Sequence, residues 1–119
     1  MTPLSHYVVS LEIAKEMKEL GFHQESLFYW VELISKDGIQ TRLIYQDGMC
    51  KKYAETQVEY SAYTSGELGE MLPDDIVYYK EENNGMDFVA KHKTVTVWND
   101  TEANARAKML IHLKKSGGI

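Results

Sequence analysis

Short runs of aromatic and branched residues, separated by turn sequences, are the feature that most constrains how this chain can fold. Residues 27–34 are rich in the side chains that favour a pleated, half-buried strand. Asp37 and Gly38 provide a tight reversal, so residues 41–45 are the predicted antiparallel partner. A second Asp-Gly turn follows, after which residues 49–53 are predicted to add a third short strand. The first half of the chain is therefore predicted to contain a β-meander.

The second half of the chain shows the same alternation of strand and turn. Residues 76–80 predict a strand, the acidic stretch 81–85 with its Asn-Gly pair predicts a hairpin turn, and residues 86–90 predict the returning strand. Residues 94–98 are rich in β-branched side chains and predict one more strand. Residues 55–63 show no clear period, so we expect a loop or an irregular strand there.

An amphipathic helix is predicted over about residues 11–20. Ser10 is a good N-cap residue, and Gly21 lies where a helix end favours a left-handed residue. The helical spacing places four apolar residues on one side: Ile13, Ala14, Met17 and Leu20.

A shorter helix is predicted near residues 65–72. Thr64 and Glu67 have the spacing of a capping box, in which each side chain accepts a hydrogen bond from the backbone N–H of the other residue. Pro73 ends this helix at Leu72, because proline restricts the residue before it.

The last helix is predicted over about residues 102–115. It begins with an acidic residue and ends with lysines, which suits the helix dipole. Its apolar residues cover a wide arc: Ala103, Ala107, Met109, Leu110, Ile111 and Leu113. The opposite stripe is predicted to be polar and consists of Asn104, Lys108, His112 and Lys115. Together the elements predict an α+β fold, an antiparallel sheet with the helices packed on one face.

The length of 119 residues predicts a single domain, residues 1–119. The hydrophobic share of 44% and the charged share of 26% are typical of globular proteins and exclude disordered and collagen-like chains. A single cysteine, Cys50, allows no intramolecular disulfide, which small secreted domains usually need. No signal peptide and no apolar segment of about 18 residues is visible, so we expect a cytoplasmic protein without a membrane span.

Charge is distributed unevenly along the chain. Residues 55–90 contain one basic and nine acidic residues, whereas residues 91–119 contain six basic and two acidic residues. The corresponding patches could pair head to tail or steer a charged partner. Solvated faces that neutralise each other across the fold are the simpler interpretation.

No sequence motif points to a catalytic or metal site. The chain lacks a nucleophile elbow, a Walker-type loop and a dinucleotide-binding glycine pattern. The four histidines are too widely spaced for a typical zinc site, so no metal or cofactor is expected. Cys50 lies beside Lys51 and Lys52, which lower a thiol pKa where the side chains converge, but a half-buried structural cysteine is the simpler interpretation.

Nucleic-acid binding has weak support. Lys91, His92 and Lys93 form a candidate basic patch beside aromatic strands. Nucleic-acid-binding domains usually have a strongly basic face and a high pI, whereas the pI of this chain is about 5.3.

The aromatic residues provide the strongest functional signal. Core packing accounts for Phe28, Trp30 and Trp98, but the eight tyrosines are too many for one small core. Neighbouring residues of a strand point to opposite faces, so some tyrosines must face away from the helices. Tyrosine and tryptophan are enriched in protein interfaces. The candidate interface residues are Tyr29, Tyr45, Tyr78 and Tyr79.

Two further segments are distinctive: Tyr-Thr-Ser-Gly-Glu-Leu-Gly-Glu-Met-Leu-Pro at residues 63–73 and the helix-forming stretch at residues 102–113. Both resemble a group of small bacterial proteins of unassigned activity that are often encoded in prophage regions. The group usually has proline where this chain has Tyr63. The resemblance covers about the second half of the chain. It implies a shared fold and a prophage origin, and it implies no activity.

The sequence thus favours a small non-catalytic binding or accessory module. It is expected to act through protein–protein contacts on an aromatic sheet face, with self-association as a homodimer as one form of that contact. The alternatives are a small enzyme whose site the fold assembles, with Cys50, His92 or the tyrosines as candidates, and a weak nucleic-acid binder.

Overall fold

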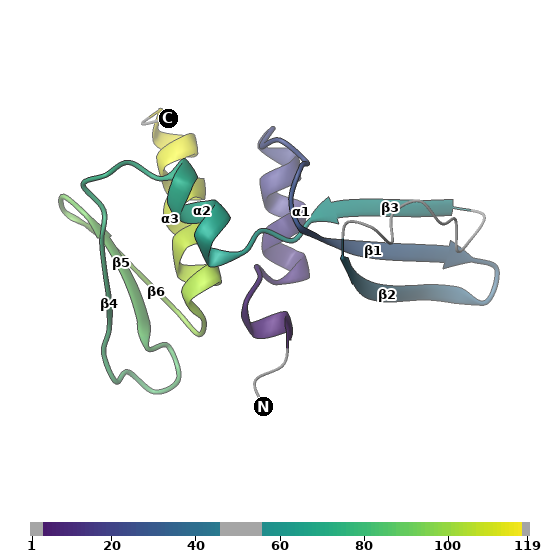
Figure 1. Ribbon diagram of the computed structural model, residues 1–119, viewed down its shortest axis with the longest axis horizontal. Helices are drawn as coiled ribbons and strands as arrows, with labels where there is room; N and C mark the ends of the chain where they lie inside the picture. The colour runs from purple at the N-terminus through teal and green to yellow at the C-terminus, as the bar shows by residue number, and fades with distance from the viewer. Residues whose placement is uncertain (1–3, 46–55, 118–119) are drawn as a thin grey trace.

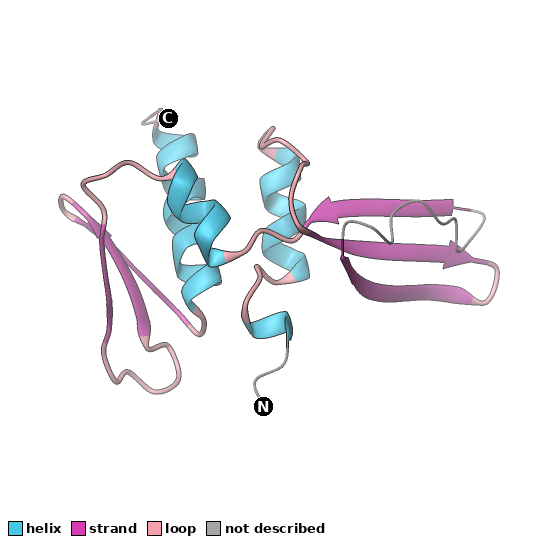
Figure 2. Ribbon diagram, in the orientation of Figure 1, coloured by secondary structure: helices cyan, strands magenta, loops and turns pink. Residues whose placement is uncertain are grey.

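Three helices lie between two three-stranded antiparallel sheets (Figure 1). The structure is a computed structural model, and it describes residues 4–45 and 56–117. The α+β class and the antiparallel pairing predicted from the sequence are confirmed. The strands, however, divide between two separate sheets, and Figure 2 shows the helices as a layer with one sheet on either side.

The first sheet is built around β1, which spans Phe28–Ser35. A tight turn connects it to β2, Gly38–Tyr45, and β3, Thr56–Ser61, pairs with its other edge, so the order is β2-β1-β3. The strand β3 lies in the region for which a loop or an irregular strand was expected. Most of its residues are polar, so the sequence shows no clear strand pattern there, but all six residues pair with β1. The strand predicted at residues 49–53 lies outside the described residues.

The second sheet is a simple meander of β4, Val77–Lys80, β5, Phe88–His92, and β6, Val95–Asn99. The turn between β4 and β5 contains Asn84 and Gly85, both with positive φ. These are the residue types that adopt left-handed conformations most easily, so the Asn-Gly turn is formed where it was predicted.

The helices begin and end at the caps that the sequence indicates. The helix α1 spans Leu11–Glu19, and Ser10 accepts a hydrogen bond from the backbone N–H of Ile13. Gly21 has a φ of 88°, and the N–H of Phe22 donates to the carbonyl of Met17, which completes a Schellman motif. A short 3₁₀ turn, η1, precedes this helix at Leu4–His6.

The other two helices are also capped, and the capping box predicted for the shorter one is present. The helix α2 spans Ser65–Met71, and both hydrogen bonds of the capping box between Thr64 and Glu67 are present. The helix α3 spans Glu102–Ser116, with Thr101 as its N-cap and Gly117 in a left-handed conformation at its end.

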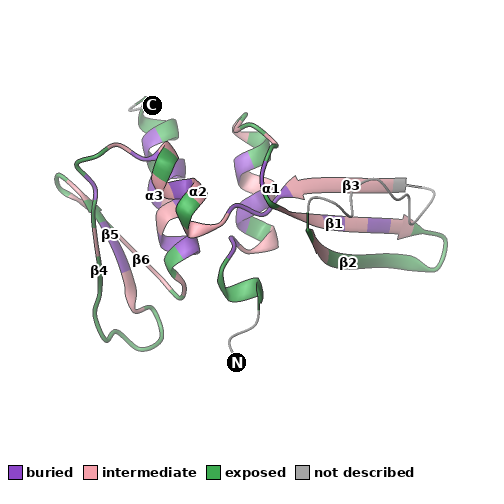
Figure 3. Cartoon of the chain, viewed as in Figure 1, coloured by how far each residue is buried: buried purple, intermediate pink, exposed green. Residues whose placement is uncertain are grey.

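The core lies between the three helices and continues to the inner face of the β4-β5-β6 sheet, on which α3 packs (Figure 3). Its central residues come from segments far apart in the sequence, with Met17 on α1, Leu68 on α2 and Leu110 on α3. The β2-β1-β3 sheet extends away from this core and is anchored at its base, where Trp30 Nε1 donates to the carbonyl of Val9 at 2.8 Å. The helices thus form the shared support for both sheets.

Candidate functional site

The four predicted interface tyrosines lie on two different sheets and do not form one surface. Tyr29 is on β1 and Tyr45 on β2, whereas Tyr78 and Tyr79 are on β4, on the far side of the helices. The two pairs therefore belong to two separate surfaces.

Tyr29 is held by local contacts. Its hydroxyl donates to the carbonyl of Gln24 and accepts from the N–H of Ser26, both at 3.2 Å. Tyr45 is exposed and lies edge-on to Phe28, with 5.5 Å between the ring centroids. Tyr29 therefore stabilises the segment before β1, while Tyr45 is exposed on the edge strand β2.

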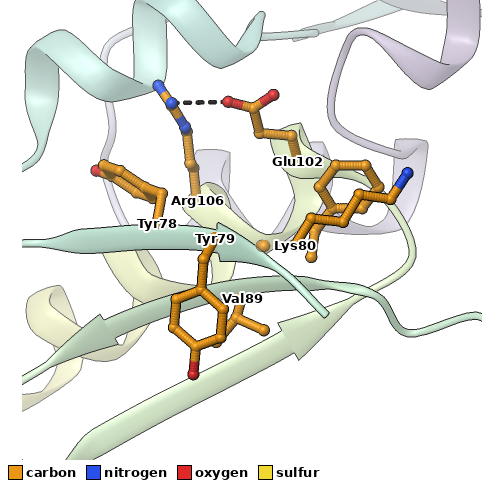
Figure 4. A pocket seen from close by; sticks show the side chains of 8 residues that line it. Tyr78, Tyr79, Lys80, Val89, Glu102 and Arg106 are labelled. Carbon is orange, nitrogen blue, oxygen red and sulfur yellow. Dashed lines mark ion pairs between the residues drawn. The ribbon is translucent and has the colours of Figure 1, made fainter. Parts of the chain in front are cut away.

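Tyr78 and Tyr79 point to opposite sides of the second sheet, as neighbouring strand residues must. Figure 4 shows Tyr78 on the side of α3, together with Arg106 and Glu102, and Tyr79 on the other side with Val89. The sheet thus has an inner face, which packs on the helices, and an outer face.

On the inner face, Tyr78 belongs to a cluster around Arg106. The guanidinium carbon of Arg106 lies 4.2 Å from the centroid of the Tyr78 ring. One terminal nitrogen pairs with Glu102 at 2.7 Å, and the other donates to the carbonyl of Ser65 at 2.9 Å. Burial raises the pKa of the Tyr78 hydroxyl above its ordinary value. Arg106 therefore joins α2, α3 and β4 through contacts that the sequence did not indicate.

A hollow of about 220 Å³ opens beside this cluster, between α3 and the β4–β5 pair (Figure 4). Lys80 lies at its rim with its ammonium group 5.2 Å from the centroid of the Phe88 ring. The charged groups of the hollow already engage partners within the chain, because Arg106 pairs with Glu102. This arrangement suits a structural junction better than a catalytic site.

On the outer face, three side chains form a row across the sheet, which we call the aromatic row: Tyr79, Val89 and Trp98. The register places Tyr79 opposite Val89 and Val89 opposite Trp98. Val89 is only 2% exposed because it lies between its two larger neighbours, whereas Tyr79 is 41% exposed. An aromatic sheet face directed away from the helices is therefore present.

Trp98 was assigned to the core from the sequence, but it is half-buried and lies on the outer face. Its neighbour Val97 instead packs against the core cluster. Because side chains alternate along β6, only one of Val97 and Trp98 can face the helices, and the sequence shows this alternation. Which of the two residues is covered, however, depends on the face on which the helices pack, and that is set by the tertiary structure.

The residues of the candidate basic patch diverge. Lys91 is exposed on the outer face, and Lys93 lies in the β5–β6 turn with a φ of 56°. His92 belongs to the inner face, where its Nε2 lies 3.0 Å from a carboxylate oxygen of Asp75. The three residues therefore do not present one continuous basic surface.

The acidic and basic blocks of the chain are only partly paired with each other. His92 and Asp75 connect them, but Lys108 and Lys115 pair with Glu16 on α1, at 3.5 and 3.0 Å. The hydrogen bond from Lys115 is the main reason that the pKa of Glu16 is lowered. The polar stripe of α3 thus binds α1 in part, and Asn104 within that stripe is buried, with 7% exposed.

Within residues 4–45 and 56–117, no group of three or more His, Cys, Asp or Glu residues could hold a metal ion. Cys50 lies outside the described residues. No helix in the described part of the chain is long and apolar enough to span a bilayer.

No protein family, curated protein or solved structure matches this chain.

Proposed function

We propose that this chain is a small non-catalytic binding module that acts through protein–protein contacts on the outer face of the β4-β5-β6 sheet. The observation that carries the proposal is the aromatic row, with Tyr79 and Trp98 at the surface on either side of Val89. Aromatic side chains bury a large area at a low entropic cost, and they dominate the energetics of many interfaces.

Further apolar surface lies close to this row. Val77 is 56% exposed, and it occupies the next outward position along β4 from Tyr79. Val77 and the aromatic row therefore form one group of apolar side chains on this sheet face, which indicates a contact surface more strongly than the same residues scattered singly.

The enzyme hypothesis has less support from the geometry. Of the residues it named, His92 is tied to Asp75, and Tyr78 is stacked on Arg106. A catalytic site needs titratable groups that converge on a space where a substrate can react. In the hollow beside Tyr78, the opposite charges of Arg106 and Glu102 neutralise each other instead.

Two predictions from the sequence belong with this proposal. The single cysteine predicts a cytoplasmic protein. The resemblance of the second half predicts a prophage-encoded accessory role. Both stay predictions.

Site-specific photo-crosslinking tests the proposed surface. A photo-reactive amino acid would replace Thr96, which is exposed and lies on the outer face beside the aromatic row. The matched control would carry it at Thr41, which is exposed on the other sheet. In bacterial cells that express the full chain, we expect protein adducts from position 96 that disappear in the Tyr79→Ala variant, and no Tyr79-dependent adducts from position 41. Adducts from position 96 that persist in Tyr79→Ala would contradict the proposal.

A further inference from the structure

The outer face of the β4-β5-β6 sheet has charges of opposite sign at its two ends. At one side of the aromatic row, the register places Lys91 on the outer face between Val77 and Thr96. At the other side, the N–H of Glu81 donates to the carbonyl of Asp87 at 2.8 Å, which continues the β4–β5 register by one outward-facing pair.

We define the basic end by Lys91 and the acidic end by Glu81 and Asp87. Both Lys91 and Glu81 are exposed. The face therefore consists of a basic end, the aromatic row and an acidic end, in that order along the strands.

We infer that the partner of this face is a second copy of the chain, packed face to face about a two-fold axis that runs along the aromatic row. The inference rests on the proposed function and names the partner of the same surface. Such an axis reverses the strand direction and keeps each row residue opposite its own copy. Lys91 of either copy then faces the acidic end of the other, so that the same contact forms twice.

The charges also exclude the other simple arrangement. A two-fold axis parallel to the strands would place Tyr79 against Trp98 of the second copy, but it would bring the two Lys91 side chains together and the two acidic ends together. Like charges placed against each other across an interface are unfavourable, and opposite charges fix its register. The electrostatics of the face therefore select the axis along the row.

The size of the face predicts a weak dimer. Three short strands spaced about 4.8 Å apart offer less area than the roughly 800 Å² per partner of a standard stable interface. We therefore expect a concentration-dependent equilibrium between monomer and dimer. Because the Lys91 contacts lie at the rim of the interface, we also expect added salt to weaken the dimer.

Sedimentation velocity on the full chain, from about 10 μM to about 1 mM, tests this inference over the affinity range of small interfaces. We expect wild type to shift from monomer to dimer across this range. Lys91→Glu and Glu81→Lys should each weaken the dimer by about tenfold or more, because each places like charges together. The double variant, which exchanges the charges, should restore dimerisation to near the wild-type level.

Glu81 is the better acidic position for this test, since a side-chain oxygen of Asp87 accepts the N–H of Asn83 and holds the turn. The matched control is Lys36→Glu, an equal charge change at the exposed β1–β2 turn, which should leave the dimer unchanged. Circular dichroism of every variant checks that the fold is retained.

The outcomes separate the two proposals. A wild-type monomer at every concentration would overturn the second-copy inference, and so would a dimer that the charge reversals leave unchanged. A dimer that both single variants weaken and the double variant fails to restore would overturn the proposed axis. If the chain is monomeric but Tyr79-dependent adducts with another protein form at position 96, the binding surface stands and only the second copy is excluded.

Discussion

Gly69 lies in α2 next to the guanidinium of Arg106, and this close approach requires the absence of a side chain. A Cβ atom at position 69 would lie 2.5 Å from a terminal nitrogen of Arg106. The end of an arginine side chain can usually move aside, but here it is held by Ser65, Glu102 and the ring of Tyr78. Gly69 therefore matters through the space it leaves for another residue.

Gly69→Ala should show this coupling in a double-mutant cycle. In a helix interior, this change normally stabilises by about 1 kcal/mol because alanine has the higher helix propensity. In the wild-type background we expect the gain to be lost or reversed, while in an Arg106→Met background we expect it to return. Urea denaturation measures both free energies of unfolding.

Gly66→Ala is the matched control, because a Cβ atom there would make only an ordinary contact with Thr64 Oγ1 at 3.9 Å. An equal effect of Gly69→Ala in the two backgrounds would show that Arg106 is not held as described.

Tyr63 is fully buried, and its hydroxyl lies close to the Ser61 side chain but forms no hydrogen bond of good geometry among the described residues. Burial raises its pKa to about 12, because a phenolate is poorly solvated in this environment. A buried polar group without a partner is unfavourable for folding. The ring itself packs in the core and lies edge-on to His23.

We therefore expect Tyr63→Phe to be as stable as wild type at neutral pH, or more stable. The raised pKa of Tyr63 favours the folded state below pH 10, and this contribution is lost as the pH rises from 10 towards 12. Over that interval the free energy of unfolding of wild type should fall more steeply than that of Tyr63→Phe. Denaturation curves at several pH values measure the difference, and a clearly less stable variant at pH 7 would indicate a partner for the hydroxyl.

At the scale of elements, Asn104 connects the starts of α1 and α3. Its side-chain oxygen accepts the N–H of Ser10, the N-cap of α1, at 2.9 Å. Its side-chain nitrogen donates to a carboxylate oxygen of Asp100 at 3.0 Å. By its helical spacing, Asn104 belongs to the polar stripe of α3. The start of α1 lies against this position, so the side-chain amide is buried and hydrogen-bonded.

Asn104→Ala should lower the free energy of unfolding by about 1–3 kcal/mol, because it leaves the N–H of Ser10 without its acceptor in a partly buried position. The control is His112→Ala, an exposed position on the same helix, for which we expect a change within about 0.5 kcal/mol. Thermal and chemical denaturation measure both variants, and equal stabilities would show that the connection between the helices contributes nothing.

At the scale of the whole molecule, the placement of the helices decides which surfaces are available for binding. The helix layer covers one face of the β4-β5-β6 sheet and leaves the face with the aromatic row open (Figure 1). The other sheet projects from the same layer, and its exposed tyrosine, Tyr45, lies on an edge strand. One sequence pattern, aromatic residues in short strands, thus has two structural outcomes.

The local structure could be predicted from the sequence because its causes lie within a few residues. Ser10 and Thr64 cap their helices through bonds to N–H groups three residues away, and the Asn84-Gly85 pair forms its turn through its own backbone preferences. The antiparallel pairing of most strands follows from the shortness of the turns between them.

Only the tertiary structure determined which face of each helix and strand is covered, and by which other element. The division into two sheets, the outward position of Trp98, the burial of Asn104 and the contacts of Arg106 all depend on segments distant in the chain. Hydrophobic burial is non-directional, so periodicity shows which residues favour a covered face but not which element covers it. The aromatic row and its charged ends lie on an open surface because α3 covers the opposite face of their sheet.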